Sequence, residues 1–71
     1  MFEIPWLKYG NKEFRYQHGK YLFKWKITAA GDRYEIYEND VLRRNNLTYW
    51  DFLAKAEILM GKNQVPGDIW N

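Results

Sequence analysis

Residues 21–28 alternate between two kinds of side chain, and this pattern limits the possible folds of the chain more than any other feature. Three of the four even positions are polar, and the odd positions carry large apolar side chains: Tyr21, Phe23, Trp25 and Ile27. A period of two is typical of a β-strand with one buried and one solvent-facing side. The chain is therefore expected to contain an antiparallel sheet that is covered on one face.

Small and polar residues divide the chain around this strand into a meander. His18-Gly19, residues 29–32 and Asn39-Asp40 have the composition of tight turns. These turns predict three strands and a short fourth strand, at about 13–17, 20–28, 33–38 and 41–45.

The apolar period changes to that of a helix after the sheet. Thr48 is a suitable N-cap, Asp51 is favoured by the helix dipole in the first turn, and Gly61 marks the end. A helix at about 49–60 would direct six side chains toward the sheet: Tyr49, Phe52, Leu53, Ala56, Leu59 and Met60. We therefore expect a single α+β domain over residues 1–71, with this C-terminal helix packed on one face and residues 62–71 as a tail.

Strand pairing can be predicted from the turns. Pairing Gln17 with Lys20, and Thr28 with Arg33, gathers the large apolar side chains on one inner face: Phe14, Tyr16, Tyr21, Phe23, Trp25, Ile27, Tyr34 and Ile36. The same pairing sets Arg43 opposite Ile36, so a bulge or a frayed edge is expected in the fourth strand.

Composition limits how the fold is held together. The 71 residues include no cysteine, so neither a disulfide nor a cysteine-ligated zinc ion can contribute, whereas 20% of the residues are aromatic and can fill a small core. No apolar run has the length of a membrane span, and residues 1–6 lack the features of a signal peptide. We therefore expect a cytoplasmic protein with no membrane partner.

The expected outer face of the sheet is basic. Its net charge is +4, whereas the rest of the chain carries −2. The charged residues expected on this face are six cations and two carboxylates: Arg15, Lys20, Lys24, Lys26, Arg33 and Arg44, with Glu13 and Glu35. The first hypothesis is a nucleic-acid-binding protein that contacts phosphates and bases through Arg15, Lys24, Lys26, Arg33, Tyr37 and Arg44. The alternative interpretation of this face is a solvated surface on which Lys26, Glu35 and Arg44 form a cross-strand charge ladder.

In architecture, a basic three-stranded sheet backed by a C-terminal helix is similar to the arm-binding domains at the start of phage and transposon integrases. The resemblance rests on architecture alone, and it implies contact with DNA through the sheet. The chain is also small, rich in aromatic residues and without a set of catalytic residues, which suggests an accessory protein of a phage or mobile element.

A second apolar stripe on the helix suggests a different function. Trp50, Ala54 and Ile58 lie outside the sheet-facing arc. Either the termini cover this stripe with Phe2, Ile4, Trp6, Ile69 and Trp70, or it stays open for another protein or a second copy of the chain. The second hypothesis is therefore a protein-interaction module or inhibitor that docks on a host protein, such as a nuclease or polymerase, through Trp6, Trp50, Ala54, Ile58 and Trp70.

The sequence shows no set of residues suited to catalysis. The single histidine, His18, lies in an expected turn, and the chain has neither serine nor cysteine. Carboxylates fall mainly at turns and in the tail, which does not favour a buried acid–base pair or a metal site. We expect a non-enzymatic binding protein with no catalytic residue, metal or cofactor.

Overall fold

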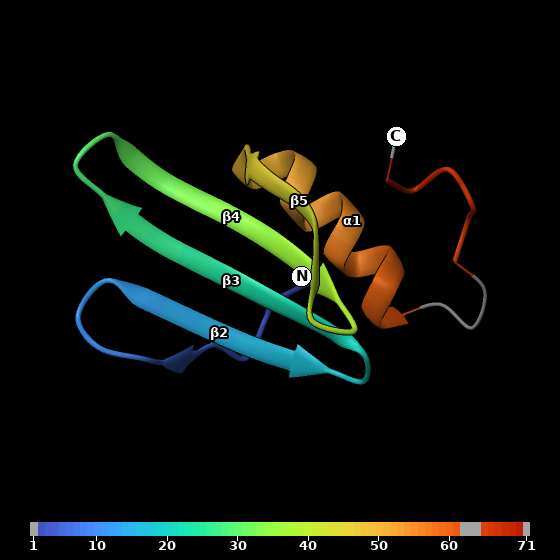
Figure 1. The fold of residues 1–71 in the computed structure, drawn as a ribbon, viewed down its shortest axis with the longest axis horizontal. Helices are drawn as coiled ribbons and strands as arrows, with labels where there is room; N and C mark the ends of the chain where they lie inside the picture. The colour runs from blue at the N-terminus through green and yellow to red at the C-terminus, as the bar shows by residue number, and fades with distance from the viewer. Residues whose placement is uncertain (1, 62–64, 71) are drawn as a thin grey trace.

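The computed structural model describes residues 2–61 and 65–70. Within these residues, five strands run in chain order through one antiparallel sheet, and one helix follows them (Figure 1): β1 (Leu7–Lys8), β2 (Glu13–His18), β3 (Tyr21–Thr28), β4 (Gly31–Glu38), β5 (Val41–Leu47) and α1 (Tyr49–Gly61). The α+β meander with a C-terminal helix is thus confirmed. Strand β1 is an addition to the expected strands, and residues 62–64 and 71 of the expected tail lie outside the described residues.

The register of the first two hairpins differs from the prediction by two residues. Phe23 pairs with Tyr16 and Ile36, and Trp25 pairs with Phe14 and Tyr34. The loop predicted at 29–32 is shorter in the structure, because Thr28 pairs with Gly31 and the Thr28 hydroxyl donates to the Gly31 carbonyl at 2.6 Å. A shift of two residues keeps every side chain on its face. The predicted inner and outer faces of β2, β3 and β4 therefore survive the correction.

The positions of the tight turns explain these shifts in register. The first hairpin turns at Gly19 and Lys20, not at His18 and Gly19, and Gly19 has a φ of 59° that suits glycine. Asn39 and Asp40 form the predicted turn between β4 and β5, and both adopt positive φ, at 51° and 67°. Positive φ at both central residues is the requirement of a type I′ hairpin turn, and Asn and Asp tolerate it better than most residues.

Strand β5 is irregular, as predicted. The ladder shifts on both sides of Ile36, which aligns with Arg44 and not with Arg43 as we expected. Arg43 is the extra residue of a bulge, and its Nη1 donates to Glu38 Oε1 at 3.0 Å. A second shift brings Leu47 opposite Tyr34, and Asn46 in this stretch has a φ of 54°. The two irregularities move the side chains of β5 out of the simple alternation that the sequence suggested.

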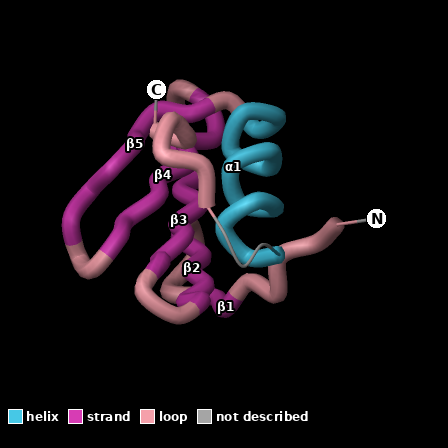
Figure 2. The backbone as a smooth tube through the Cα atoms, turned by 90° about the vertical axis from the view of Figure 1, so that its right-hand side faces the viewer, coloured by secondary structure: helices cyan, strands magenta, loops and turns pink. Residues whose placement is uncertain are grey.

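Helix α1 covers the β3–β4 side of the inner face (Figure 2). Thr48 caps it, since its Oγ1 accepts a hydrogen bond from the Asp51 amide at 3.2 Å. Phe52 is completely buried, stacks on Tyr34 with ring centroids 4.8 Å apart, and meets Phe23 edge-on at 5.9 Å. Ala56 and Leu59 continue this contact along the helix. Of the helix residues expected in the core, Tyr49 is the exception, because it remains 46% exposed.

The N-terminal segment (residues 2–6) provides a second cover. It lies on the same side of the sheet as α1 in Figure 2. Trp6 stacks on Phe52 with centroids 5.9 Å apart and packs on Trp25 at 5.8 Å, while Ile4 is buried in the core. Ile69, from the other end of the chain, is buried in the same cluster. Both termini therefore complete the core of the sheet.

Candidate functional site

The outer face places the predicted basic residues in adjacent pairs. Arg15 on β2 lies opposite Lys24 on β3, and Lys26 on β3 lies opposite Arg33 on β4. Like charges directly opposite each other across a ladder are destabilising unless other charges compensate. The partners of these cations therefore decide how much free charge the face offers.

Two glutamates neutralise much of this charge. Glu13 pairs with Arg15, and this contact holds the pKa of the Glu13 carboxyl below its usual range. Lys26 Nζ lies 3.4 Å from Glu35 Oε1, which also accepts a hydrogen bond from the Tyr37 hydroxyl at 3.0 Å. Burial and the bond to Glu35 raise the pKa of Tyr37. Lys24 Nζ lies 4.6 Å from the centre of the Tyr37 ring, so Tyr37 is engaged within the chain on both its polar and its aromatic parts.

Two of the six expected cations do not share the outer-face ladder. Lys20 lies in the first turn and pairs with Glu38 at 3.0 Å, an interaction that raises the pKa of Lys20. Arg44 aligns with Ile36 of the inner face, and its Nη1 donates to the Arg43 carbonyl at 2.7 Å. The described outer face thus holds four cations and two carboxylates, and its net charge is +2, not the +4 of the simple alternation.

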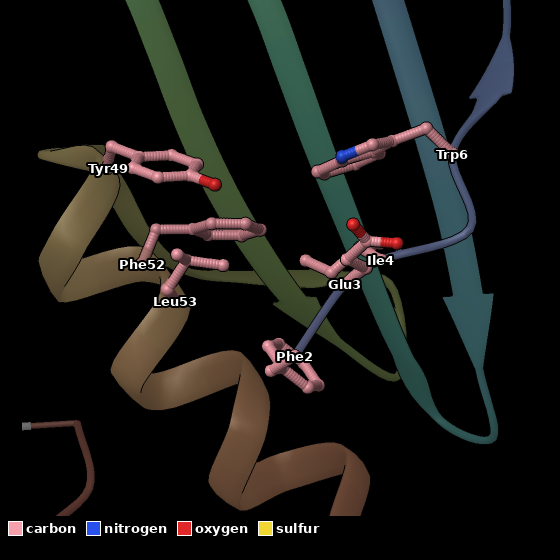
Figure 3. Close-up of a pocket in the computed structure, with 7 residues that line it drawn as sticks. All are labelled: Phe2, Glu3, Ile4, Trp6, Tyr49, Phe52 and Leu53. Atoms are coloured by element: carbon pink, nitrogen blue, oxygen red, sulfur yellow. The ribbon is translucent and has the colours of Figure 1, made fainter.

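A hollow aromatic surface lies between the helix and the N-terminal segment. One pocket of about 260 Å³ is lined by residues of both elements (Figure 3): Phe2, Glu3, Ile4, Trp6, Tyr49, Phe52 and Leu53. A neighbouring pocket of about 300 Å³ is lined by Phe2, Trp50, Leu53, Ala54 and Glu57. The two pockets share Phe2 and Leu53. We call this continuous surface the aromatic face.

Trp50 is the most exposed of the large apolar side chains on the aromatic face. It is 76% exposed, and its ring meets Tyr49, itself 46% exposed, with centroids 5.2 Å apart. The termini therefore pack into the core without covering Trp50. Large contiguous apolar surfaces on a small protein often mark a binding site, whereas single exposed apolar residues do not.

The structure separates the five residues predicted to bind protein. Trp6, Trp50 and Ala54 all line the aromatic face. Ile58 and Trp70 line neither pocket; both pack against the core, and the Arg43 guanidinium lies 5.0 Å from the Trp70 ring centre. Sequence reasoning assigned Tyr49 and Leu53 to the core alone and gave no role to Glu3 or Glu57. No periodic pattern marks Glu3, because the N-terminal segment is irregular.

Catalytic and metal-binding groups do not converge in residues 2–61 and 65–70. No group of three or more His, Asp and Glu side chains there could hold a metal ion, and no helix there is long and apolar enough to cross a membrane. The only buried side-chain nitrogen or oxygen in these ranges that lacks a hydrogen-bond partner is Trp25 Nε1. This indole is enclosed by Trp6, Phe14 and Tyr34 in the aromatic cluster of the inner face.

Among the described residues, the aromatic face and the outer face of the sheet are thus the two surfaces on which a function can be argued. The aromatic face combines exposed aromatic rings with two pockets. The outer face carries four cations, of which Arg15, Lys24 and Lys26 already interact with other residues of the chain. Comparison with family models, with characterised proteins and with solved structures found no match to this chain.

Proposed function

We propose that this chain is a protein-binding module, an adaptor or an inhibitor, that docks on its partner through the aromatic face. The observation that carries the proposal is the position of Trp50, which is 76% exposed on helix α1 and lines the second of the two adjoining pockets. Tryptophan is among the residues that contribute most to protein–protein affinity, particularly where neighbouring side chains exclude water around it.

The composition of the aromatic face supports this proposal. Its centre is apolar, with Phe2, Trp50 and Leu53, and the charged residues among its described lining are the two exposed carboxylates Glu3 and Glu57. An apolar centre with a polar rim is the usual anatomy of a protein interface. Burial of Phe52, Ala56 and Leu59 on the other side of α1 holds the helix in place, so little ordering of the helix backbone is needed on binding.

Site-specific crosslinking tests the proposal. A photoreactive amino acid at Ala54, on the aromatic face, should form a crosslink to a defined protein in the cells that normally contain this chain. The same amino acid at Lys26, on the outer face of the sheet, should not. Trp50→Ala should reduce capture of that protein about tenfold or more, in line with a tryptophan hot spot. Leu42→Ala is the matched control, since Leu42 is an exposed apolar residue, 44% exposed, that lies opposite Tyr37 of the outer face. Equal capture by Trp50→Ala and the original chain would refute the proposal.

Nucleic-acid binding through the outer face is the second candidate. The specific observation in its favour is the pair of like-charge neighbours, Arg15 with Lys24 and Lys26 with Arg33. A phosphate backbone would relieve their mutual repulsion. The intramolecular partners of Arg15, Lys24 and Lys26 favour the first proposal over this one.

Salt dependence distinguishes nucleic-acid binding from protein docking. If the outer face binds nucleic acid, affinity should fall steeply with added salt, and Lys24→Glu with Lys26→Glu should abolish binding. Trp50→Ala should leave this binding unchanged because it lies on the aromatic face. This candidate would be eliminated if the affinity for nucleic acid changed neither with added salt nor with the double substitution.

A further inference from the structure

The two pockets of the aromatic face are similar in size, but the first pocket has the more specific chemistry. Three of its lining residues carry polar groups: the Glu3 carboxylate, the Tyr49 hydroxyl and the Trp6 indole nitrogen. Figure 3 shows Tyr49, with its hydroxyl, on the helix side of the pocket, and the Trp6 ring and the Glu3 carboxylate on the side of the N-terminal segment. Aromatic walls with a few convergent polar groups are typical of a specific binding pocket.

The charge of this pocket indicates the kind of group that it accepts. Glu3 is the one charged residue among the described residues that line it, and Glu3 forms no ion pair within the described residues. A pocket of about 260 Å³ lies just below the range of about 300–1,000 Å³ typical of small-molecule sites. It therefore has room for one long side chain with a cationic end.

A guanidinium group fits these surroundings better than an ammonium group. It is planar and weakly hydrated, it packs well against aromatic rings, and it can donate two parallel hydrogen bonds to one carboxylate. Glu3 can accept such a pair of bonds, and the Tyr49 oxygen can accept a third. The indole N–H of Trp6 would remain for a carbonyl group of the same ligand, since indole is a donor only.

We infer that the first pocket takes an arginine side chain of the partner protein, with Glu3 as its counter-ion. This inference rests on the proposed protein-binding function and adds the chemistry of one contact to it. Trp50 and the second pocket, which Glu57 also lines, then hold the apolar part of the same partner surface.

Titration with short peptides tests the pocket without knowledge of the partner. The probe is acetyl-Gly-Arg-Gly-amide, and the neutral control has citrulline in place of arginine. Saturable NMR shifts are expected at the Trp6 indole N–H and at the backbone amides of Glu3 and Leu53. Because the ion pair would be partly exposed, the arginine peptide should bind about three- to tenfold more tightly than the citrulline peptide.

Two matched substitutions distinguish a direct ion pair with Glu3 from attraction by the overall negative charge of the aromatic face. Glu3→Gln should bring the affinity for the arginine peptide down to that for the citrulline peptide. Glu57→Gln makes the same change of charge in the second pocket and should leave the affinity within about twofold, since exposed charges at a distance are screened. Both glutamates are exposed, so neither change should unfold the chain.

Several outcomes would overturn the inference. It fails if the arginine and citrulline peptides bind equally, if a lysine peptide binds as tightly as the arginine peptide, or if Glu57→Gln weakens binding as much as Glu3→Gln. It also fails if the Trp6 shifts appear on concentrating the chain alone and vanish in Arg15→Gln or Arg33→Gln, because the arginine would then come from a second copy.

The inference and the proposed function fail in different experiments. Loss of partner capture in Trp50→Ala, combined with no preference for arginine in the titration, would leave the protein-binding function standing without this contact. Unchanged capture in Trp50→Ala would remove the protein-binding function whatever the peptides do.

Discussion

The two faces of the sheet are built from alternate residues of the same strands, yet they are stabilised in opposite ways. On the inner face, Phe23 and Ile36 are fully buried under the helix and the N-terminal segment. On the outer face, the side chains of Arg15 and Lys26 remain 37% exposed and pair with Glu13 and Glu35. The inner face needs other elements to cover it, whereas the outer face largely compensates its own charges.

This difference shows where a partner can gain most. Covering the outer face would desolvate ion pairs that already exist, and little net affinity follows from that. The aromatic face lies where the cover of the inner face ends, and there Tyr49 and Trp50 remain exposed. Substitutions on the inner face, the outer face and the aromatic face should therefore differ in the size of their effect and in whether they change stability or binding.

The largest effect is expected from Phe52→Ala. Phe52 is fully buried and contacts Phe23, Tyr34 and Trp6, so its loss leaves a cavity beneath both covers. The free energy of unfolding should fall by about 3–5 kcal/mol. A chain of 71 residues has about 4–10 kcal/mol in total, so this loss is a large share of the stability and should lower the Tm strongly in thermal denaturation followed by circular dichroism. A small shift in Tm would contradict a core centred on Phe52.

Trp6→Ala should have the next largest effect. Trp6 is half-buried between Phe52 and Trp25, so its removal should lower the free energy of unfolding by about 1.5–3 kcal/mol in urea titration. Trp50→Ala is the matched control on the exposed side of the helix and should stay within about 0.5 kcal/mol of the original chain. Equal effects of the two substitutions would mean that the N-terminal segment does not cover the sheet.

On the outer face, the pair of Lys26 and Glu35 should contribute little. A double-mutant cycle with Lys26→Gln and Glu35→Gln should give a coupling energy of about 0.2–1 kcal/mol, typical of a solvent-accessible pair. The cycle is needed because Lys26→Gln also removes repulsion from Arg33 across the ladder. A coupling above about 2 kcal/mol would show that the outer face is as important for stability as a buried cluster.

The smallest effect is a dependence on pH. Since Arg15 lowers the pKa of Glu13 in the folded chain, the charged form of Glu13 stabilises the fold above its ordinary pKa of 4.5. This contribution is lost as the pH falls through the lowered pKa. Glu13→Gln should therefore lose less stability than the original chain on acidification from neutral pH to about pH 2. Identical acid denaturation curves of the two chains would show that this contact does not persist in solution.

Prediction from the sequence worked best where a pattern repeats. The alternation in β3 and the helical period after Thr48 were sufficient for the α+β class, because burial of one face follows directly from spacing. Pairing was wrong by two residues in the first two hairpins, since the closing pairs depend on the turns at Gly19 and before Gly31. Because the register was wrong by an even number of residues, each side chain still lies on its predicted face.

The candidate surfaces were harder to predict. Arg15, Lys24, Lys26 and Arg33 do share one face, but the bulge in β5 removes Arg44 from their register. Trp50 and Ala54 were correctly placed on a second side of the helix, whereas the pocket beside them depends on Glu3 and Phe2. These two residues lie in a segment with no period, so only its packing against α1 shows their position.

The sequence by itself determined the type and order of the main strands and the helix, and the face that each large apolar side chain of β2, β3 and β4 occupies. These properties follow from the spacing of apolar residues along the chain, because that spacing fixes which side chains share one face of a strand or helix. Only the tertiary structure decided how the charges compensate one another and how the N-terminal segment meets the helix. Those contacts join residues far apart in sequence, such as Trp6 and Phe52, and their geometry depends on the packing of the whole chain.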